Sequence, residues 1–60
     1  MTRTEISTAL TAASYYYAAG RLNLGEALEA ITACAEGVAT IAQRTAIEAL
    51  VEDYAVEVPA

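Results

Sequence analysis

The sequence predicts an all-α fold, a small helical hairpin followed by a short third helix or helical extension. Three observations favour this class. Fifteen of the 60 residues are alanine, whose small side chain permits close approach of helix backbones. Apolar residues recur at steps of three and four along most of the chain. Three glycines and one proline are the only strong interruptions, and they divide the chain into helix-sized pieces.

The length predicts one domain over residues 1–60, because a single core needs most of a chain this short. Only 18 side chains are large and apolar, counting leucine, isoleucine, valine, tyrosine and methionine. A core this thin should leave the isolated monomer marginally stable. We therefore expect a partner, most simply a second copy of the chain in a homodimer or larger oligomer.

The first helix is predicted at about residues 3–19. Thr2 lies three residues before Glu5, the spacing of a capping box that satisfies free amide groups at a helix start. Gly20 follows as a left-handed stop. The apolar positions in between line one helical face, namely Ile6, Ala9, Leu10, Ala13, Tyr16 and Tyr17.

The second helix is predicted at about residues 24–43. Asn23 lies three residues before Glu26, again at cap spacing. Gly37 costs on the order of 1 kcal/mol inside a helix relative to alanine. Because the apolar pattern continues past it, we prefer a helix that runs on and is loosened there, with a break at Gly37 rather than near Thr45 as the alternative. The residues of that stripe are Leu24, Leu28, Ile31, Ala35, Val38 and Ala42.

A third helix is predicted at about residues 45–54, because the apolar pattern changes phase there. Its apolar residues would point away from the preceding stripe if the helix were continuous, and Thr45 with Glu48 supplies a new cap signal. One long helix with two apolar faces is the alternative. Residues 55–60 are predicted to be an extended or frayed tail ending near Pro59.

The net charge of −5 is unevenly spread. Residues 1–22 sum to +1, whereas residues 23–60 hold one arginine against seven acids and sum to −6. Such an acidic surface repels phosphate backbones and anionic membranes, so we expect no direct nucleic-acid or membrane partner. A protein with a basic surface is the expected partner, and solubility alone is the competing explanation of the acidity.

The composition argues against an enzyme. Histidine and lysine are absent and aspartate occurs once, which removes most side chains used in acid–base and metal chemistry, so no cofactor and no metal site are expected. Cys34 is the only cysteine and is expected to be a buried structural thiol, with a disulfide across a dimer axis as the alternative. A lone thiol favours a reducing cytoplasm. The longest uncharged run, residues 6–20, is too short and too polar for a membrane span or a signal sequence.

Three consecutive tyrosines at residues 15–17 cannot all enter one core, because neighbouring helical positions point about 100° apart. Tyrosine is enriched at the centres of interfaces. We predict partner contacts through an exposed ring and the carboxylates of the second helix, Tyr15, Glu26, Glu29 and Glu36. Self-association is predicted through a second set, Tyr16, Ile47, Leu50, Val51 and Tyr54.

The leading functional hypothesis is a non-enzymatic protein-binding module. Small acidic chains without catalytic side chains are of the type that phages and mobile elements encode as inhibitors of host machinery, anti-CRISPR and other anti-defence proteins among them. Such a protein would act in the cytoplasm of the host cell. A structural or accessory subunit of a larger assembly is the first alternative. An oligomer that sequesters a nucleotide, stacked on Tyr15 with Arg3 or Arg21 on its phosphate, is the second.

Overall fold

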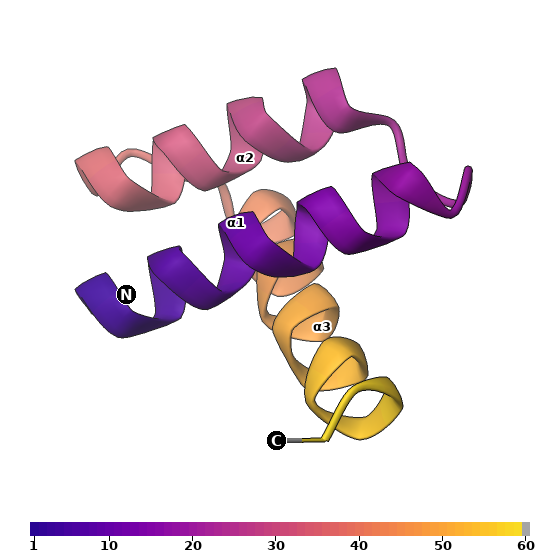
Figure 1. Cartoon of the computed structure of the whole chain (residues 1–60). Coiled ribbons are helices and arrows are strands. Elements are labelled where there is room, and N and C mark those ends of the chain that lie inside the picture. Colours follow the sequence, from indigo (N-terminus) through magenta and orange to yellow (C-terminus); the bar gives the residue numbers. More distant parts are fainter. Residues whose placement is uncertain (60) are drawn as a thin grey trace.

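Three helices make up residues 1–59, the part of the chain that the structure, a computed structural model, describes (Figure 1). The helix α1 spans Arg3–Ala18, α2 spans Leu24–Glu36 and α3 spans Ile41–Glu57. The first two run antiparallel, side by side, and α3 crosses them at a steep angle (Figure 1). Each helix contacts both others, and residues 1–59 contain no strand. The predicted all-α class is confirmed.

The ends of α1 are those that the sequence predicts to within a residue. The Glu5 amide donates to the Thr2 hydroxyl oxygen at 3.1 Å, and the Thr2 amide donates back to the Glu5 carboxylate at 3.0 Å. At the other end Gly20 adopts a left-handed conformation, with φ of 73°. This turn lets the Arg21 amide donate to the Tyr16 carbonyl at 2.9 Å, which satisfies one of the last free carbonyls of the helix.

Helix α2 begins as predicted but ends earlier. The Glu26 amide donates to the Asn23 side-chain oxygen at 3.1 Å, which confirms the cap. The predicted continuation to residue 43 is wrong, because Gly37 is left-handed with φ of 74° and stops the helix. The Val38 amide then donates to the Ala33 carbonyl at 2.9 Å. The left-handed turn at Gly37 satisfies free carbonyl groups at the helix end and changes the direction of the chain. Ending the helix in this way is more favourable here than extending it by two turns.

Helix α3 is longer than predicted at both ends. It begins at Ile41, where Thr40 and Gln43 form a capping box, so the predicted start at residue 45 is wrong and Thr45 lies inside the helix. A glutamine reaches back to the cap amide as well as a glutamate does. The helix continues to Glu57, so the predicted extended tail is wrong for residues 55–57. Position 60 lies outside the described residues.

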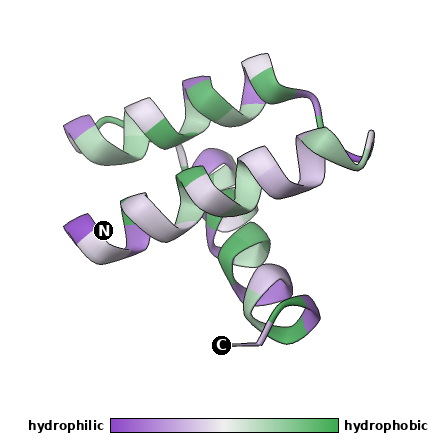
Figure 2. Ribbon diagram, in the orientation of Figure 1, coloured by the Kyte–Doolittle hydropathy of each residue, from purple (hydrophilic) through white to green (hydrophobic). Residues whose placement is uncertain are grey.

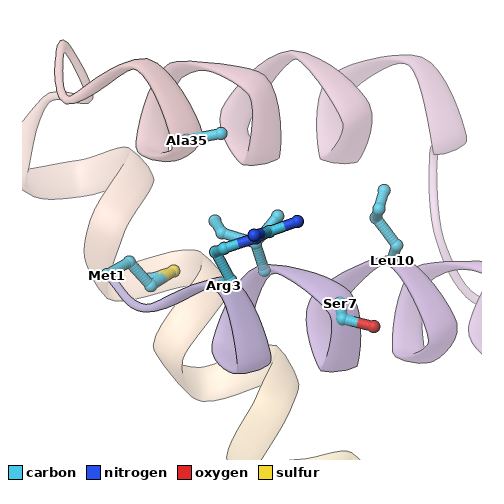
Figure 3. Close-up of a pocket in the computed structure, with 6 residues that line it drawn as sticks. Met1, Arg3, Ser7, Leu10 and Ala35 are labelled. Atoms are coloured by element: carbon cyan, nitrogen blue, oxygen red, sulfur yellow. The ribbon is translucent and has the colours of Figure 1, made fainter.

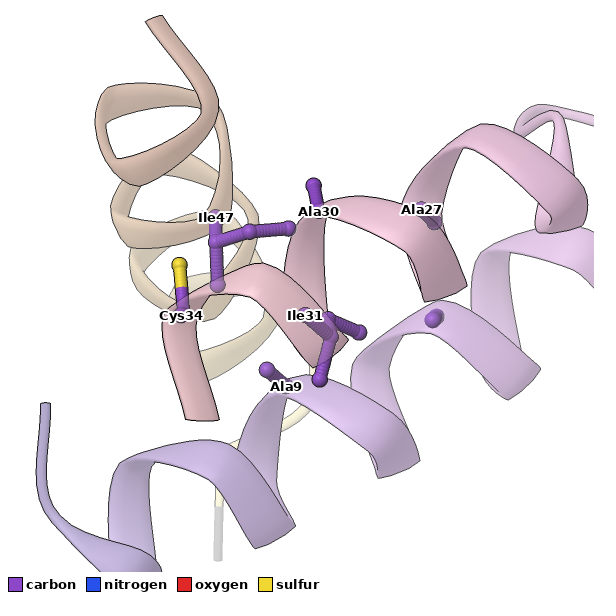
Figure 4. Packing of buried hydrophobic residues seen from close by; sticks show 7 residues of the cluster. Ala9, Ala27, Ala30, Ile31, Cys34 and Ile47 are labelled. Carbon is purple, nitrogen blue, oxygen red and sulfur yellow. The ribbon is translucent and has the colours of Figure 1, made fainter. Parts of the chain in front are cut away.

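The core lies where the three helices meet, and small side chains dominate it (Figure 4). Alanines let the helix backbones approach closely, while two isoleucines fill the remaining space. The buried cluster consists of Ala9, Ala13, Ala27, Ala30, Ile31, Cys34 and Ile47.

The predicted apolar stripes overlap the buried faces only in part: Ala9, Ala13 and Tyr16 of the first stripe and Ile31 of the second are buried. Leu10, Tyr17 and Leu28 belong to those stripes and are exposed, whereas alanines on the adjacent side of each helix are buried. Figure 2 shows hydrophobic and hydrophilic residues interspersed along the helices. The fold therefore leaves apolar side chains at its surface.

Candidate protein-binding surfaces

The acidic partner-binding residues predicted on the second helix lie together on α2. Glu26, Glu29 and Glu36 are all exposed; Glu29 and Glu36 lie opposite the buried residues of this helix, and Glu26 lies on its flank. We call these three the acidic face. The only ion pair within residues 1–59 joins Arg21 to Glu57, so no cation of the described chain neutralises the acidic face. The face is therefore free to attract cations of another molecule.

Tyr15, the predicted aromatic contact, is half covered by the chain's own rings. Its ring meets the edge of Tyr16 with centroids 5.1 Å apart and that of Tyr54 with centroids 5.6 Å apart. The contact with Tyr54 joins α1 to α3. Tyr15 remains 41% exposed, and Tyr17 is more exposed still. A part of the Tyr15 ring is thus accessible, beside a rigid aromatic cluster.

Tyr16 is buried, and a charged pair covers it. The Arg21 guanidinium lies 4.9 Å from the Tyr16 ring centroid and donates to both carboxylate oxygens of Glu57, at 3.0 and 3.1 Å. Burial and the nearby Glu57 carboxylate raise the pKa of the Tyr16 hydroxyl above its ordinary value of 10.0. The hydrogen bond with Glu57 raises the pKa of Arg21. A phosphate at Arg21 would therefore have to compete with Glu57 for the guanidinium.

The residues predicted to form an oligomer interface pack against the chain's own core. Ile47 is buried, while Leu50 and Val51 are partly buried against the core cluster. Tyr54 is half-buried against Tyr15. The break at Gly37 explains this placement, because it lets α3 fold back and turn its apolar side toward the hairpin. A second copy is not needed to cover these side chains.

Two grooves that the sequence alone does not reveal flank α2. One, the hairpin groove, has a volume of about 270 Å³ and runs between α1 and α2 (Figure 3). Leu10 and Ala35 face into it from opposite helices, the Arg3 side chain extends into its middle, and Met1 lies near its end (Figure 3). The pair Ile6 and Leu10 at helical spacing is its signal in the sequence. That signal shows an apolar face but not that the face stays uncovered.

The other, the α2–α3 groove, has a volume of about 290 Å³ and lies between the first turns of α2 and the middle of α3. Its lining is mainly apolar, and two carboxylates stand at it from different helices. The lining residues are Leu22, Asn23, Glu26, Ala27, Ala46, Ile47, Ala49, Leu50 and Asp53. One member of the acidic face, Glu26, therefore also borders this groove.

The described residues meet neither the requirements of a metal site nor those of a membrane-spanning helix. Across residues 1–59, no three cysteine, aspartate or glutamate side chains converge in a group that could hold a metal ion. Within the same residues no helix has the length and apolarity needed to cross a membrane. No protein-family model, no curated protein and no solved structure matches the chain.

Proposed function

We propose that this chain is a non-enzymatic protein-binding module that places the acidic face of α2 against a basic surface of another macromolecule. The observation that carries the proposal is the row of three exposed glutamates, none of which is paired with a cation of the described chain. Glu26 and Glu36 are ten residues apart, about 15 Å along a helix. A row of that length suits a partner surface with several arginine or lysine side chains.

Charge of this kind serves association more than stability. Unscreened carboxylates steer a cationic partner toward the face and repel wrong partners. The chain carries its net charge of −5 on 60 residues, so the field is strong for its size. Surfaces that bind nucleic acid are basic for the opposite reason. An acidic helix that occupies such a surface would block it, which is the proposed mode of action as an inhibitor.

The biological role that we propose is inhibition of host machinery, of the anti-CRISPR or other anti-defence type that phages and mobile elements encode. Small size, acidity and the scarcity of acid–base side chains support this role. The protein would then act in the cytoplasm, with a protein and no nucleic acid as its direct partner.

The test compares two double variants that change the net charge equally. Glu29→Gln with Glu36→Gln removes charge from the acidic face, whereas Glu48→Gln with Glu52→Gln removes it from exposed positions of α3. Each variant and the wild type are immobilised, and captured host proteins are quantified by mass spectrometry. We expect the first pair to reduce capture of the specific partner by about tenfold or more. The second pair should leave capture near the wild-type level, and an equal loss with both pairs would contradict the proposal.

A structural or accessory subunit is the second candidate, and the hairpin groove favours it. Leu10 stands at this groove and is exposed, as is Leu28 on the adjoining helix. Exposed apolar side chains on neighbouring helices are a common basis of assembly. On this candidate the chain would dock through α1 and α2, with itself or with another subunit.

A further inference from the structure

The α2–α3 groove combines an apolar floor with carboxylates on both walls. Ala27, Ile47 and Leu50 supply apolar surface, while Glu26 stands on α2 and Asp53 on α3. We propose that this groove binds a basic amphipathic helix of the partner, which inserts an aliphatic side chain between lysines or arginines. The inference rests on the proposed protein-binding function and names the kind of segment that is bound.

The groove exists because small residues line the part of α3 that faces it. Ala46 and Ala49 stand where larger side chains would fill the space toward Ala27. The resulting volume of about 290 Å³ is at the lower end of pockets that enclose whole small molecules, which start at about 300 Å³. Aliphatic side chains presented by a peptide suit such a space better. A cleft between two helices also accepts the ridge of a third helix.

The charges at the groove determine which helix would bind. Covering the groove takes water from Glu26 and Asp53, and neither has an ion-pair partner in the described chain. Desolvating an unpaired carboxylate is costly, so a purely apolar occupant is disfavoured. Arg21 is the cation closest in sequence to the groove lining, and it already donates to Glu57. Arg44 has no ion-pair partner in the described chain but does not line the groove, so the compensating cations must come from the occupant.

The same charges disfavour a second copy of this chain as occupant. A copy brings a net charge of −5 and only three arginines, of which Arg21 is paired within the chain. Docking two copies at their α2–α3 grooves would bring the carboxylates of both together, and like charges at close range repel. A foreign helix with an excess of lysine or arginine meets the requirement directly.

The test uses a synthetic helical peptide with leucines along one face and lysines on both flanks, and a second peptide with glutamates in place of the lysines. Ala49→Leu fills the groove with a good helix former, and Ala55→Leu is its control at an exposed position of the same helix. We expect the lysine peptide to bind the wild type and the Ala55→Leu protein equally. Ala49→Leu should weaken binding by about tenfold or more.

A charge variant of the groove makes the second arm. Glu26→Gln with Asp53→Asn should weaken binding and flatten its dependence on salt, whereas Glu48→Gln with Glu52→Gln should do neither. The glutamate peptide should not bind. The inference is overturned if Ala49→Leu binds the lysine peptide as tightly as the wild type does, if both peptides bind alike, or if neither binds.

Mapping by amide chemical shifts separates this inference from the proposed function. Peptide-induced shifts at residues 22–27 and 46–53 support the groove. Shifts confined to Glu29 and Glu36, with no effect of Ala49→Leu, would overturn the groove while leaving the acidic face as the binding surface. Conversely, peptide binding in the groove together with unimpaired host-protein capture by the Glu29 and Glu36 variant would overturn only the role of the acidic face.

Discussion

Ile47 is the residue on which the attachment of α3 most depends, because it is the only buried side chain of that helix. It is 2% exposed and packs in the core cluster with residues of the other two helices. Replacing it with alanine removes its contacts in this cluster, where the short alanine side chains cannot fill the space that it leaves. We expect Ile47→Ala to lower the free energy of unfolding by about 2–4 kcal/mol, measured by urea denaturation.

Ile41 provides the control for this substitution, since it lies in the same helix and is 87% exposed. Ile41→Ala should change the free energy of unfolding by no more than about 0.5 kcal/mol. Similar losses at both positions would mean that α3 does not pack on the hairpin through Ile47.

The capping box of α1 contains a glutamate where that of α3 contains a glutamine, and only the glutamate makes its box sensitive to pH. Glu5 completes the first box, and its hydrogen bonds with Thr2 lower the pKa of its carboxyl group below 4.5. The contribution of this group to stability is therefore complete above pH 4.5 and is lost as the pH falls through the lowered pKa. Gln43 completes the second box and does not titrate.

We expect the helical Cα chemical shifts of residues 3–6 to diminish below pH 4.5, while those of residues 41–44 stay constant. The variant Glu5→Gln copies the chemistry of the second box and should abolish the difference between the two helix starts. Parallel fraying of both starts in acid, or an unchanged response in the Glu5→Gln protein, would show that the carboxyl group is not responsible.

Helix ends that are fixed by side chains a few residues apart could be predicted from the sequence. Helix ends at which the sequence is compatible with two conformations could not. The caps at Thr2 and Asn23 and the stop at Gly20 involve side chains and amides only a few residues apart. Gly37 offered two outcomes, a costly position within a helix or a left-handed stop. The apolar pattern favoured the first, because alanines on several sides of α2 extend any stripe that is drawn through them.

The candidate surfaces, too, could be predicted from the sequence only in part. Exposure of the glutamates on α2 follows from helical phase and could be predicted. The buried faces could be predicted only in part, because a core of close-packed alanines leaves Leu10 and Leu28 outside, against the order of hydrophobicity. The grooves depend on how far apart packed helices stand, which is a property of the assembled fold.

The molecule as a whole measures 28 × 22 × 16 Å, so it has little interior in which to bury apolar side chains. We therefore still expect self-association, through a different surface from the one first predicted. The residues first predicted for an interface are used within the chain, so we consider the exposed apolar side chains at and beside the hairpin groove instead. Leu28 lies seven residues before Ala35, hence on the same side of α2 as this groove. A second copy placed there would cover Leu10 and Leu28.

We expect a dimer by light scattering at micromolar concentration, and a monomer of unchanged helix content for the double variant Leu10→Ser and Leu28→Ser. Val56→Ser is the control, because Val56 is a 79% exposed apolar residue on α3. A wild-type protein that remains monomeric, or a double variant that remains a dimer, would rule out self-association through the hairpin.

The buried thiol of Cys34 can be used to measure how often the fold opens. The thiol is the only one in the chain, is 8% exposed, and belongs to the cluster to which all three helices contribute. A thiol reagent reaches it only when the helices separate, so the labelling rate is the intrinsic thiol rate multiplied by the fraction of open molecules. The kinetics of a single covalent modification, followed by mass, thus measure the opening equilibrium under native conditions without added denaturant or an engineered probe.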